Sequence, residues 1–125
     1  QLREDALAVE RWNRLHPDQE PRTPLVTERL GHGPAPVVAV TDFMAAVPDQ
    51  VSRWIHRPYS SLGTDGFGRS DTREALRRFF ETDAGHVVVA VLSALARAGA
   101  VDPDEVAKAA ARHGIDPDVG PPWTR

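Results

Sequence analysis

The first part of the chain alternates a helical pattern with a segment rich in helix breakers. Apolar residues recur at helical spacing over residues 4–15 and predict a helix that Pro17 ends. The residues that follow, 18–36, hold four prolines and two glycines and predict an extended connector, with a short turn of helix near residues 24–30. The apolar positions of the first helix are Leu7, Ala8, Trp12 and Leu15.

The middle of the chain predicts two strands separated by a helix. Val37–Thr41 is a continuous β-branched and apolar run, which suits a strand covered on both faces in a parallel sheet. Asp42 is placed to cap a helix that runs to about residue 55, and Pro48 should start or bend that helix. Tyr59–Leu62 is a second, weaker strand. The helix is expected to bury Phe43, Val47, Val51, Trp54 and Ile55.

Two capped helices are predicted after a glycine-rich loop. Asp71 and Glu74 have the spacing of a capping box and predict a helix that continues to Phe80. Asp83 can cap the second helix, because the apolar run that follows keeps the helical period until Gly99 stops it.

A last helix and a proline-rich tail complete the pattern. Asp102 can cap a helix that begins at Pro103, a favoured first position for proline, and ends near His113. Residues 115–125 should form an extended tail. The fold class is therefore α/β, but two strands are too few for an independent sheet and leave two open edges. We expect an incomplete mixed or parallel sheet with helices packed on it, the later part of a domain whose first strand is missing.

Length, composition and charge limit the classes of protein to which this chain can belong. The 125 residues fit one domain, and 41% hydrophobic residues allow a core. A net charge of −3 argues against a nucleic-acid surface, and no apolar run approaches the roughly 20 residues of a membrane span. The chain has no cysteine, which permits a cytoplasmic location. Its first residue is Gln1 rather than Met, from which we expect a piece of a longer protein.

The glycine-rich loop 61–73 matches none of the phosphate-binding or catalytic loop motifs. Asp71 stands where a dinucleotide-binding loop needs its third glycine, and Arg69 stands where a P-loop needs lysine. A nucleophile elbow and a calcium loop fail in the same way. The loop is interpreted as a structural crossover with glycines at positive φ and Phe67 plugging a neighbour, while an anion or partner contact stays open as the alternative. Gly68→Val is then expected to destabilise the fold.

Other polar residues show no catalytic or metal-binding spacing. No two histidines lie at i and i+4, so a zinc site is not expected. His16 is interpreted as a helix-end cap or interface contact rather than a catalytic group, and His86 as a satisfied core position. The carboxylate groups fit cap and turn chemistry, and the three tryptophans form no stacking platform. These carboxylates are Asp102, Asp104, Glu105, Asp116 and Asp118.

Several segments in collinear order resemble one family. Together they are similar to the C-terminal end of the homodimeric bacterial pyruvate dehydrogenase E1 components. The core Gly63-x-Asp65-x-Phe67-Gly68-x-Ser70 also resembles the wider transketolase superfamily. The segments are Glu10–Pro17, Val37–Met44, Leu62–Arg73, Phe80–Asp83, Val87–Leu95 and, more loosely, Ala109–Asp118.

This resemblance implies a fold and a parent enzyme. The implied fold is the transketolase C-terminal domain, a scaffold or dimerisation part. The implied parent uses thiamine diphosphate and Mg²⁺ to decarboxylate pyruvate and to acetylate the lipoyl group of its E2 acyltransferase. Its cofactor motif lies upstream, and Asp65-Gly66 lacks the accompanying Asn. We therefore expect no catalytic, cofactor-binding or metal-binding residue here, and no cofactor bound by this chain alone.

The resemblance also implies partners and leaves rival roles open. The expected partners are the rest of the E1 chain, a second E1 protomer and the E2 acyltransferase in the cytoplasm, with no nucleic acid and no membrane. We expect an N-terminal helix and connector over 1–36, a transketolase C-terminal-like core over 37–114 and a tail over 115–125. The alternatives are a stand-alone interaction or assembly module and one subunit of a split transketolase-like carboligase.

Overall fold

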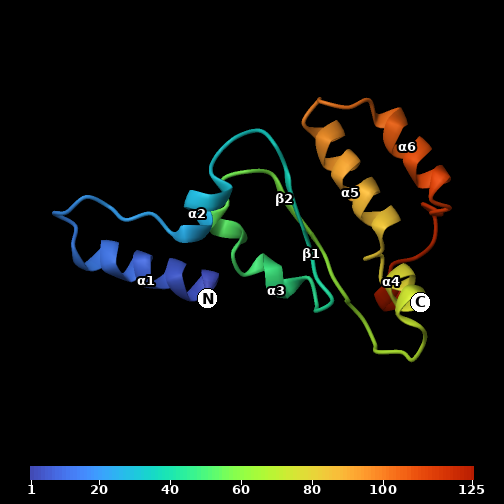
Figure 1. Ribbon diagram of the computed structural model, residues 1–125, viewed down its shortest axis with the longest axis horizontal. Helices are drawn as coiled ribbons and strands as arrows, with labels where there is room; N and C mark the ends of the chain where they lie inside the picture. Colours follow the sequence, from blue (N-terminus) through green and yellow to red (C-terminus); the bar gives the residue numbers. More distant parts are fainter.

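A computed structural model describes residues 1–125 of the chain. The molecule is elongated, with α1 and α2 at one end, two strands in the middle and the α5–α6 pair at the other end (Figure 1). The elements in chain order are α1 (Leu2–Leu15), α2 (Leu25–Leu30), β1 (Val37–Val40), α3 (Ala46–Asp49), the 3₁₀ turn η1 (Ser52–Trp54), β2 (Tyr59–Leu62), α4 (Arg73–Phe79), α5 (Ala84–Arg97), α6 (Pro103–Arg112) and the 3₁₀ turn η2 (Pro122–Thr124).

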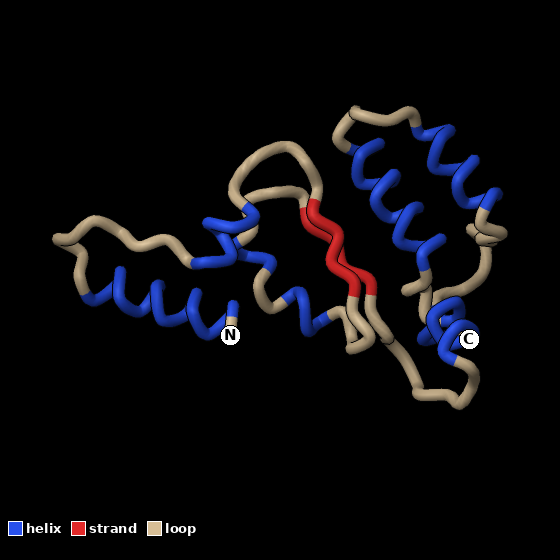
Figure 2. Tube along the Cα trace, in the orientation of Figure 1, coloured by secondary structure: helices blue, strands red, loops and turns tan.

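The sheet consists of β1 and β2 alone, paired in parallel as predicted (Figure 2). Val37 lies opposite Tyr59 and Val40 opposite Leu62. A parallel pair needs a crossover connection, and α3 and η1 lie on the crossover between the two strands. Helix α5 packs beside β1. The α/β class and the incomplete parallel sheet are therefore confirmed.

The single helix predicted for residues 42–55 is wrong. The structure has only α3 and η1 there, because Pro48 has no N–H to donate and the amides of Val51 and Trp54 bond three residues back, as in 3₁₀ turns. Without a continuous helix, the predicted apolar face does not form. Phe43 is 71% exposed and Val47 is also exposed, whereas the burial predicted for Trp54 and Ile55 is confirmed.

The hydrophobic core lies at the N-terminal end, where α1, α2 and η1 meet. It consists of Ala6, Val26, Trp54 and Ile55. Two polar contacts fix the tryptophan in this core: its indole N–H donates to Glu10 at 2.8 Å, and its carbonyl accepts the Thr27 hydroxyl at 2.6 Å. The strand pair therefore extends away from the core rather than forming its centre.

Side-chain caps begin the last three helices. Asp83 accepts the His86 amide at 2.9 Å and Asp102 accepts the Asp104 amide at 2.9 Å, so both predicted caps are confirmed. The Asp71–Glu74 capping box is wrong, because Thr72 occupies the cap position and accepts the amide of Ala75. Asp71 instead accepts the Thr72 amide and stands one residue outside the helix.

Two features of the last third bear on the sequence predictions. The tail is not fully extended, because η2 turns near its end and the terminal Arg125 pairs with Glu81 at 2.8 Å. By length and composition alone, one stretch, residues 73–97, is apolar enough to cross a membrane. The structure divides that stretch into α4 and α5, with Glu81 between them at φ 60°. The expected absence of a membrane partner stays a prediction.

Candidate functional site

The loops that follow β1 and β2 lie in direct contact at the carboxyl end of the sheet. The Thr64 amide donates to the Phe43 carbonyl at 2.8 Å, and the Thr64 hydroxyl donates to the Asp42 carbonyl. A Cβ on Gly63 would stand 2.4 Å from the Ala45 amide nitrogen, closer than real Cβ contacts come. Only glycine therefore allows the two loops to approach this closely.

Asp65 joins the same two loops. Its carboxylate accepts the Ala45 amide at 3.3 Å, just before α3 begins. Asp65 thus has a structural contact within the chain. No group of three or more His, Asp or Glu side chains is arranged to hold a metal ion. The residues present do not fit a magnesium–diphosphate site, since the Asp65 carboxylate accepts a backbone amide and belongs to no such group.

The glycine loop differs from its predicted conformation at two positions. Gly66 has a φ of +119° and passes the Trp123 backbone, so positive φ is confirmed there. Gly68 has no positive φ, and a Cβ on it would meet nothing within 4 Å. Phe67 is 91% exposed and plugs no neighbour, because the loop keeps this residue on its outer side.

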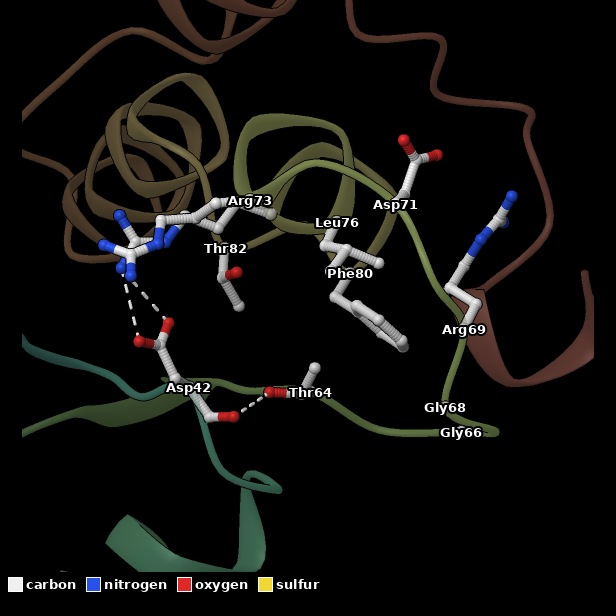
Figure 3. A pocket seen from close by; sticks show the side chains of 11 residues that line it. Asp42, Thr64, Gly66, Gly68, Arg69, Asp71, Arg73, Leu76, Phe80 and Thr82 are labelled. Atoms are coloured by element: carbon white, nitrogen blue, oxygen red, sulfur yellow. Dashed lines mark hydrogen bonds and ion pairs between the residues drawn. The ribbon is translucent and has the colours of Figure 1, made fainter.

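A pocket of about 520 Å³ lies between this loop and α4 (Figure 3). Leu76 and Phe80 form its apolar wall, and polar side chains stand at both ends. The lining residues are Asp42, Thr64, Gly66, Gly68, Arg69, Asp71, Arg73, Leu76, Arg77, Phe80 and Thr82. Many of these lining residues belong to the glycine-rich loop 61–73 that the sequence analysis singled out.

Three arginines and two aspartates set the charge of the pocket. Arg77 pairs with Asp42 at 3.2 Å, and the Arg69 guanidinium lies over the Phe79 ring, 4.0 Å from its centroid. Arg73 forms no ion pair. The pocket therefore carries a net positive charge, with two arginines that have no carboxylate partner. The arginines are spaced four residues apart along the chain, but Arg69 lies in the loop before α4 and Arg73 and Arg77 lie on α4, so the spacing alone did not predict the pocket.

A second polar cluster holds the α4–α5 junction together. Asp83 accepts the His86 amide and the His86 ring nitrogen Nδ1, the latter at 2.8 Å, and pairs with Arg78 at 3.3 Å. Partial burial alone would raise the pKa of Asp83, but the hydrogen bonds from His86 and Arg78 outweigh it and lower that pKa. The ionised carboxylate is therefore the form that the fold stabilises. His86 is a satisfied, mostly buried side chain, as predicted.

Replacing Asp83 with Asn should remove part of the pH dependence of stability. Because the folded-state pKa of Asp83 lies below its ordinary value of 3.8, its contribution is present above that value and is lost as the pH falls through the folded-state pKa. We expect a loss of about 1 kcal/mol at neutral pH. Urea unfolding followed by circular dichroism between about pH 6 and pH 3 measures it.

Asp18→Asn is the matched control, because Asp18 is exposed and its side chain makes no hydrogen bond or ion pair. This variant should keep the stability of the native chain across the same pH range. Equal losses in both variants, or an Asp83→Asn loss that grows as the pH falls, would contradict the assigned direction of the pKa.

The histidines lie apart from the pocket. His16 ends α1, stacks on Trp12 with centroids 4.4 Å apart and contacts the Trp12 carbonyl, so its predicted helix-end position is confirmed. His32 and His56 stack in parallel at 4.6 Å and form an isolated bridge just ahead of the two strands. Sequence spacing missed this pair, because the two residues are 24 positions apart and meet only when the strands pair.

A comparison with known protein families identifies the family to which this fold belongs. The chain belongs to the transketolase-like TK C-terminal domain family, whose model matches residues 3–83. The matched range includes both strands, the close loop contact at Gly63 and all of the residues that line the pocket.

Individual relatives extend the match over nearly the whole chain, and they are named pyruvate dehydrogenase E1 component. The protein from Pseudomonas aeruginosa is 53% identical over 119 residues, which is 94% of this chain and 14% of that protein. The one from Mycolicibacterium smegmatis is 49% identical over 116 residues, 93% of this chain and 12% of that protein. The one from Escherichia coli K12 is 47% identical over 119 residues, 94% of this chain and 13% of that protein. The chain thus spans about one-seventh of the first of these relatives.

Proposed function

We propose that this chain is the C-terminal scaffold or dimerisation part of a pyruvate dehydrogenase E1 component. The observation that carries the proposal is the 47–53% identity to enzymes of that name over 93–94% of this chain. Identity at that level over so many consecutive residues accompanies a shared fold and shared contact surfaces. The parent is then an oxidoreductase that acts on pyruvate, and this chain is one of its supporting parts.

The exposed surface supports a scaffold role. A compact monomer of 13.7 kDa is expected to expose about 6,600 Å². This chain exposes 8537 Å² and buries only 10 of its 125 residues. The excess of about 1,900 Å² is comparable with the area of a standard protein interface. Surface of this extent is suited to contact with other parts of a larger enzyme.

Large apolar side chains gather at the loops after the strands. Phe43 and Met44 follow β1, Phe67 follows β2, and all three are exposed. Exposed apolar patches on soluble proteins mark contact surfaces. We infer that these loops pack against the rest of the E1 chain or against a second E1 protomer.

The cofactor and the remaining partners belong to the proposed parent. Thiamine diphosphate with Mg²⁺ would supply the carbanion chemistry of pyruvate decarboxylation when bound elsewhere in that enzyme. The acetyl unit would pass to a lipoyl group of the E2 acyltransferase, in the cytoplasm. In this proposal the chain supplies support rather than ligands, and alone it does not turn over pyruvate.

One observation favours a second candidate from a different class. Both outer edges of the β1–β2 pair lack a strand partner, and such edges accept strands from other chains. A stand-alone assembly module would use them to dock a partner subunit. A split transketolase-like carboligase, in which another chain supplies the cofactor, would use the same surface.

A chimaeric enzyme tests the leading proposal. The matching residues of the Pseudomonas aeruginosa E1 component would be replaced with residues 1–125 of this chain. Because the contact surfaces are expected to be shared, the chimaera should form the same oligomer as the parent enzyme. It should also decarboxylate pyruvate at a comparable rate, measured by a dye-coupled assay and by size-exclusion chromatography.

Two variants of the chimaera serve as controls. Gly63→Leu should abolish assembly and activity, because its side chain would occupy the space of the Ala45 backbone. Gly68→Ala should leave both unchanged, because the space around Gly68 is open. A chimaera that folds but neither assembles nor decarboxylates pyruvate would overturn the proposal and favour the assembly module.

A further inference from the structure

We propose that the end of the chain, residues 119–125, is a strap that orders the glycine loop and holds Phe67 outward. Only its last step, the use of Phe67 as a contact, rests on the proposed function. The chain returns from α6 to α4 at its end (Figure 1), and it passes beside Gly66 and Arg69 of the loop (Figure 3). Two segments that are far apart in the sequence therefore lie side by side.

The glycine loop has little support of its own. No amide of residues 65–71 donates a hydrogen bond to another backbone group. Strand β2 ends at Leu62 and α4 begins at Arg73, so neither element orders the residues between them. On one side, Asp65 is tied to the Ala45 amide. The remainder of the loop keeps one conformation only if another segment supports it.

The backbone at Trp123 provides that second support. Gly66, at a φ of +119°, lies so close to it that an added Cβ would stand 3.0 Å from the Trp123 Cα and 3.4 Å from its nitrogen. Only glycine allows two backbones to approach in this conformation. The tail thus occupies the side toward which a Gly66 side chain would point. Phe67, the next residue, is left 91% exposed.

Two anchors hold the tail in this position. The Arg125 guanidinium donates to the Phe79 carbonyl at 3.1 Å and to the Glu81 carboxylate at 2.8 Å, and Pro122 is buried. Arg69 of the loop and Arg125 of the tail also lie near the same Phe79 ring, 4.0 and 5.1 Å from its centroid. Helix α4 therefore fixes the loop and the tail against one another.

The strap is built so that it can open. A cavity of about 410 Å³ remains between the loop, α4 and the tail. Val119 and Trp123 are both exposed, and Pro122 is the buried residue of this segment. Because the tail has few buried apolar contacts, its release costs less free energy than unfolding of the core. Release removes the second support of the loop, so the tail controls whether Phe67 is held in place.

Relaxation of ¹⁵N in the full 125-residue chain tests this coupling. The amides of residues 66–68 should have order parameters of about 0.85, as in rigid backbone. Pro122→Ser combined with Arg125→Ala should lower them below about 0.6, because both anchors are lost. The melting temperature should fall little, since neither residue belongs to the core cluster. Arg112→Ala, at an exposed arginine of α6, is the control and should leave the loop unchanged.

A substitution in the loop tests the coupling in the opposite direction. If the tail orders the loop, the loop must also order the tail. Gly66→Ala places a Cβ against the Trp123 backbone and should lower the order parameter of the Trp123 amide below about 0.6. Gly68→Ala is the matched control, because the space around Gly68 is open. This pair decides the matter even if the tail variant does not fold.

The chimaera described above tests the use of Phe67. Phe67→Ala and the Pro122→Ser/Arg125→Ala pair should each raise the dissociation constant of the oligomer by about fivefold. Combined, they should raise it no further than either change alone, because both act through the same contact. Fully additive effects would overturn the part assigned to Phe67.

Two results would overturn the strap itself. One is a set of order parameters at residues 66–68 that the loss of both anchors leaves at the native value. The other is an equal decrease in the Arg112→Ala control. Both measurements use the isolated chain, so their failure leaves the chimaera experiment unaffected, and a chimaera that does not assemble counts against the proposed function alone.

Discussion

Replacing Gly63 with alanine should destabilise the chain by about 3 kcal/mol or more. The added Cβ would stand 2.4 Å from the Ala45 amide nitrogen and 2.8 Å from the Phe43 carbonyl oxygen. Both are backbone atoms, so no rotamer change can relieve the clash, and the two loops must separate. That separation also breaks the Thr64–Phe43 hydrogen bond. Chemical denaturation followed by circular dichroism gives the change in the free energy of unfolding.

Gly68→Ala is the matched control in the same loop. A Cβ at Gly68 meets nothing within 4 Å, and its φ is not positive, so the native conformation accepts alanine. The expected change is a gain of up to about 0.5–1 kcal/mol, because alanine restricts the unfolded chain. This corrects the sequence-based expectation that a side chain at Gly68 destabilises the fold. Similar losses of unfolding free energy for both variants would show that the loop tolerates no added side chain at either position, and would contradict the assignment of the effect to the contact between Gly63 and Ala45.

Trp54→Ala should cost about 3–5 kcal/mol and leave the N-terminal end only partly folded. Trp54 is the largest side chain of the core formed with Ala6, Val26 and Ile55. Its loss opens a cavity and removes the indole donor from Glu10. Urea unfolding, with helix content followed by circular dichroism, should show a lower midpoint.

The control for this variant is Trp123→Ala. Trp123 is 59% exposed and belongs to no core cluster, so its removal should change the free energy of unfolding by less than about 1 kcal/mol. An equal effect of the two substitutions would contradict the assignment of the core to the N-terminal end.

Local chemistry made much of the secondary structure predictable. Asp83 and Asp102 each stand one residue ahead of a helical pattern, and a side-chain acceptor at that position satisfies free amides. The first strand followed from the β-branched run at Val37–Thr41, whereas the second, Tyr59–Leu62, contains no β-branched residue and gave the weaker signal. At Asp71 and Thr72 the sequence does not decide which residue caps α4, since both are good N-cap residues. Only the structure shows that Thr72 is the cap.

The site could be predicted only in part, because its geometry depends on contacts between distant segments. The sequence singled out the glycine loop and left an anion contact open, but it gave Gly63 no special part. The need for glycine there comes from Ala45, which lies 18 positions earlier and approaches only in the folded chain. The exposure of Phe43 has a similar origin, since it depends on the failure of the helix expected after Asp42.

The placement of the core at one end has a consequence for how the molecule unfolds. The buried cluster ties α1 to α2 and η1, whereas α5 and α6 pack on each other at the far end. The two ends are connected mainly through the slender strand pair, so little apolar contact links their stabilities. Loss of structure at one end therefore need not propagate to the other, and cooperativity across the whole chain has to come from the surroundings that cover it.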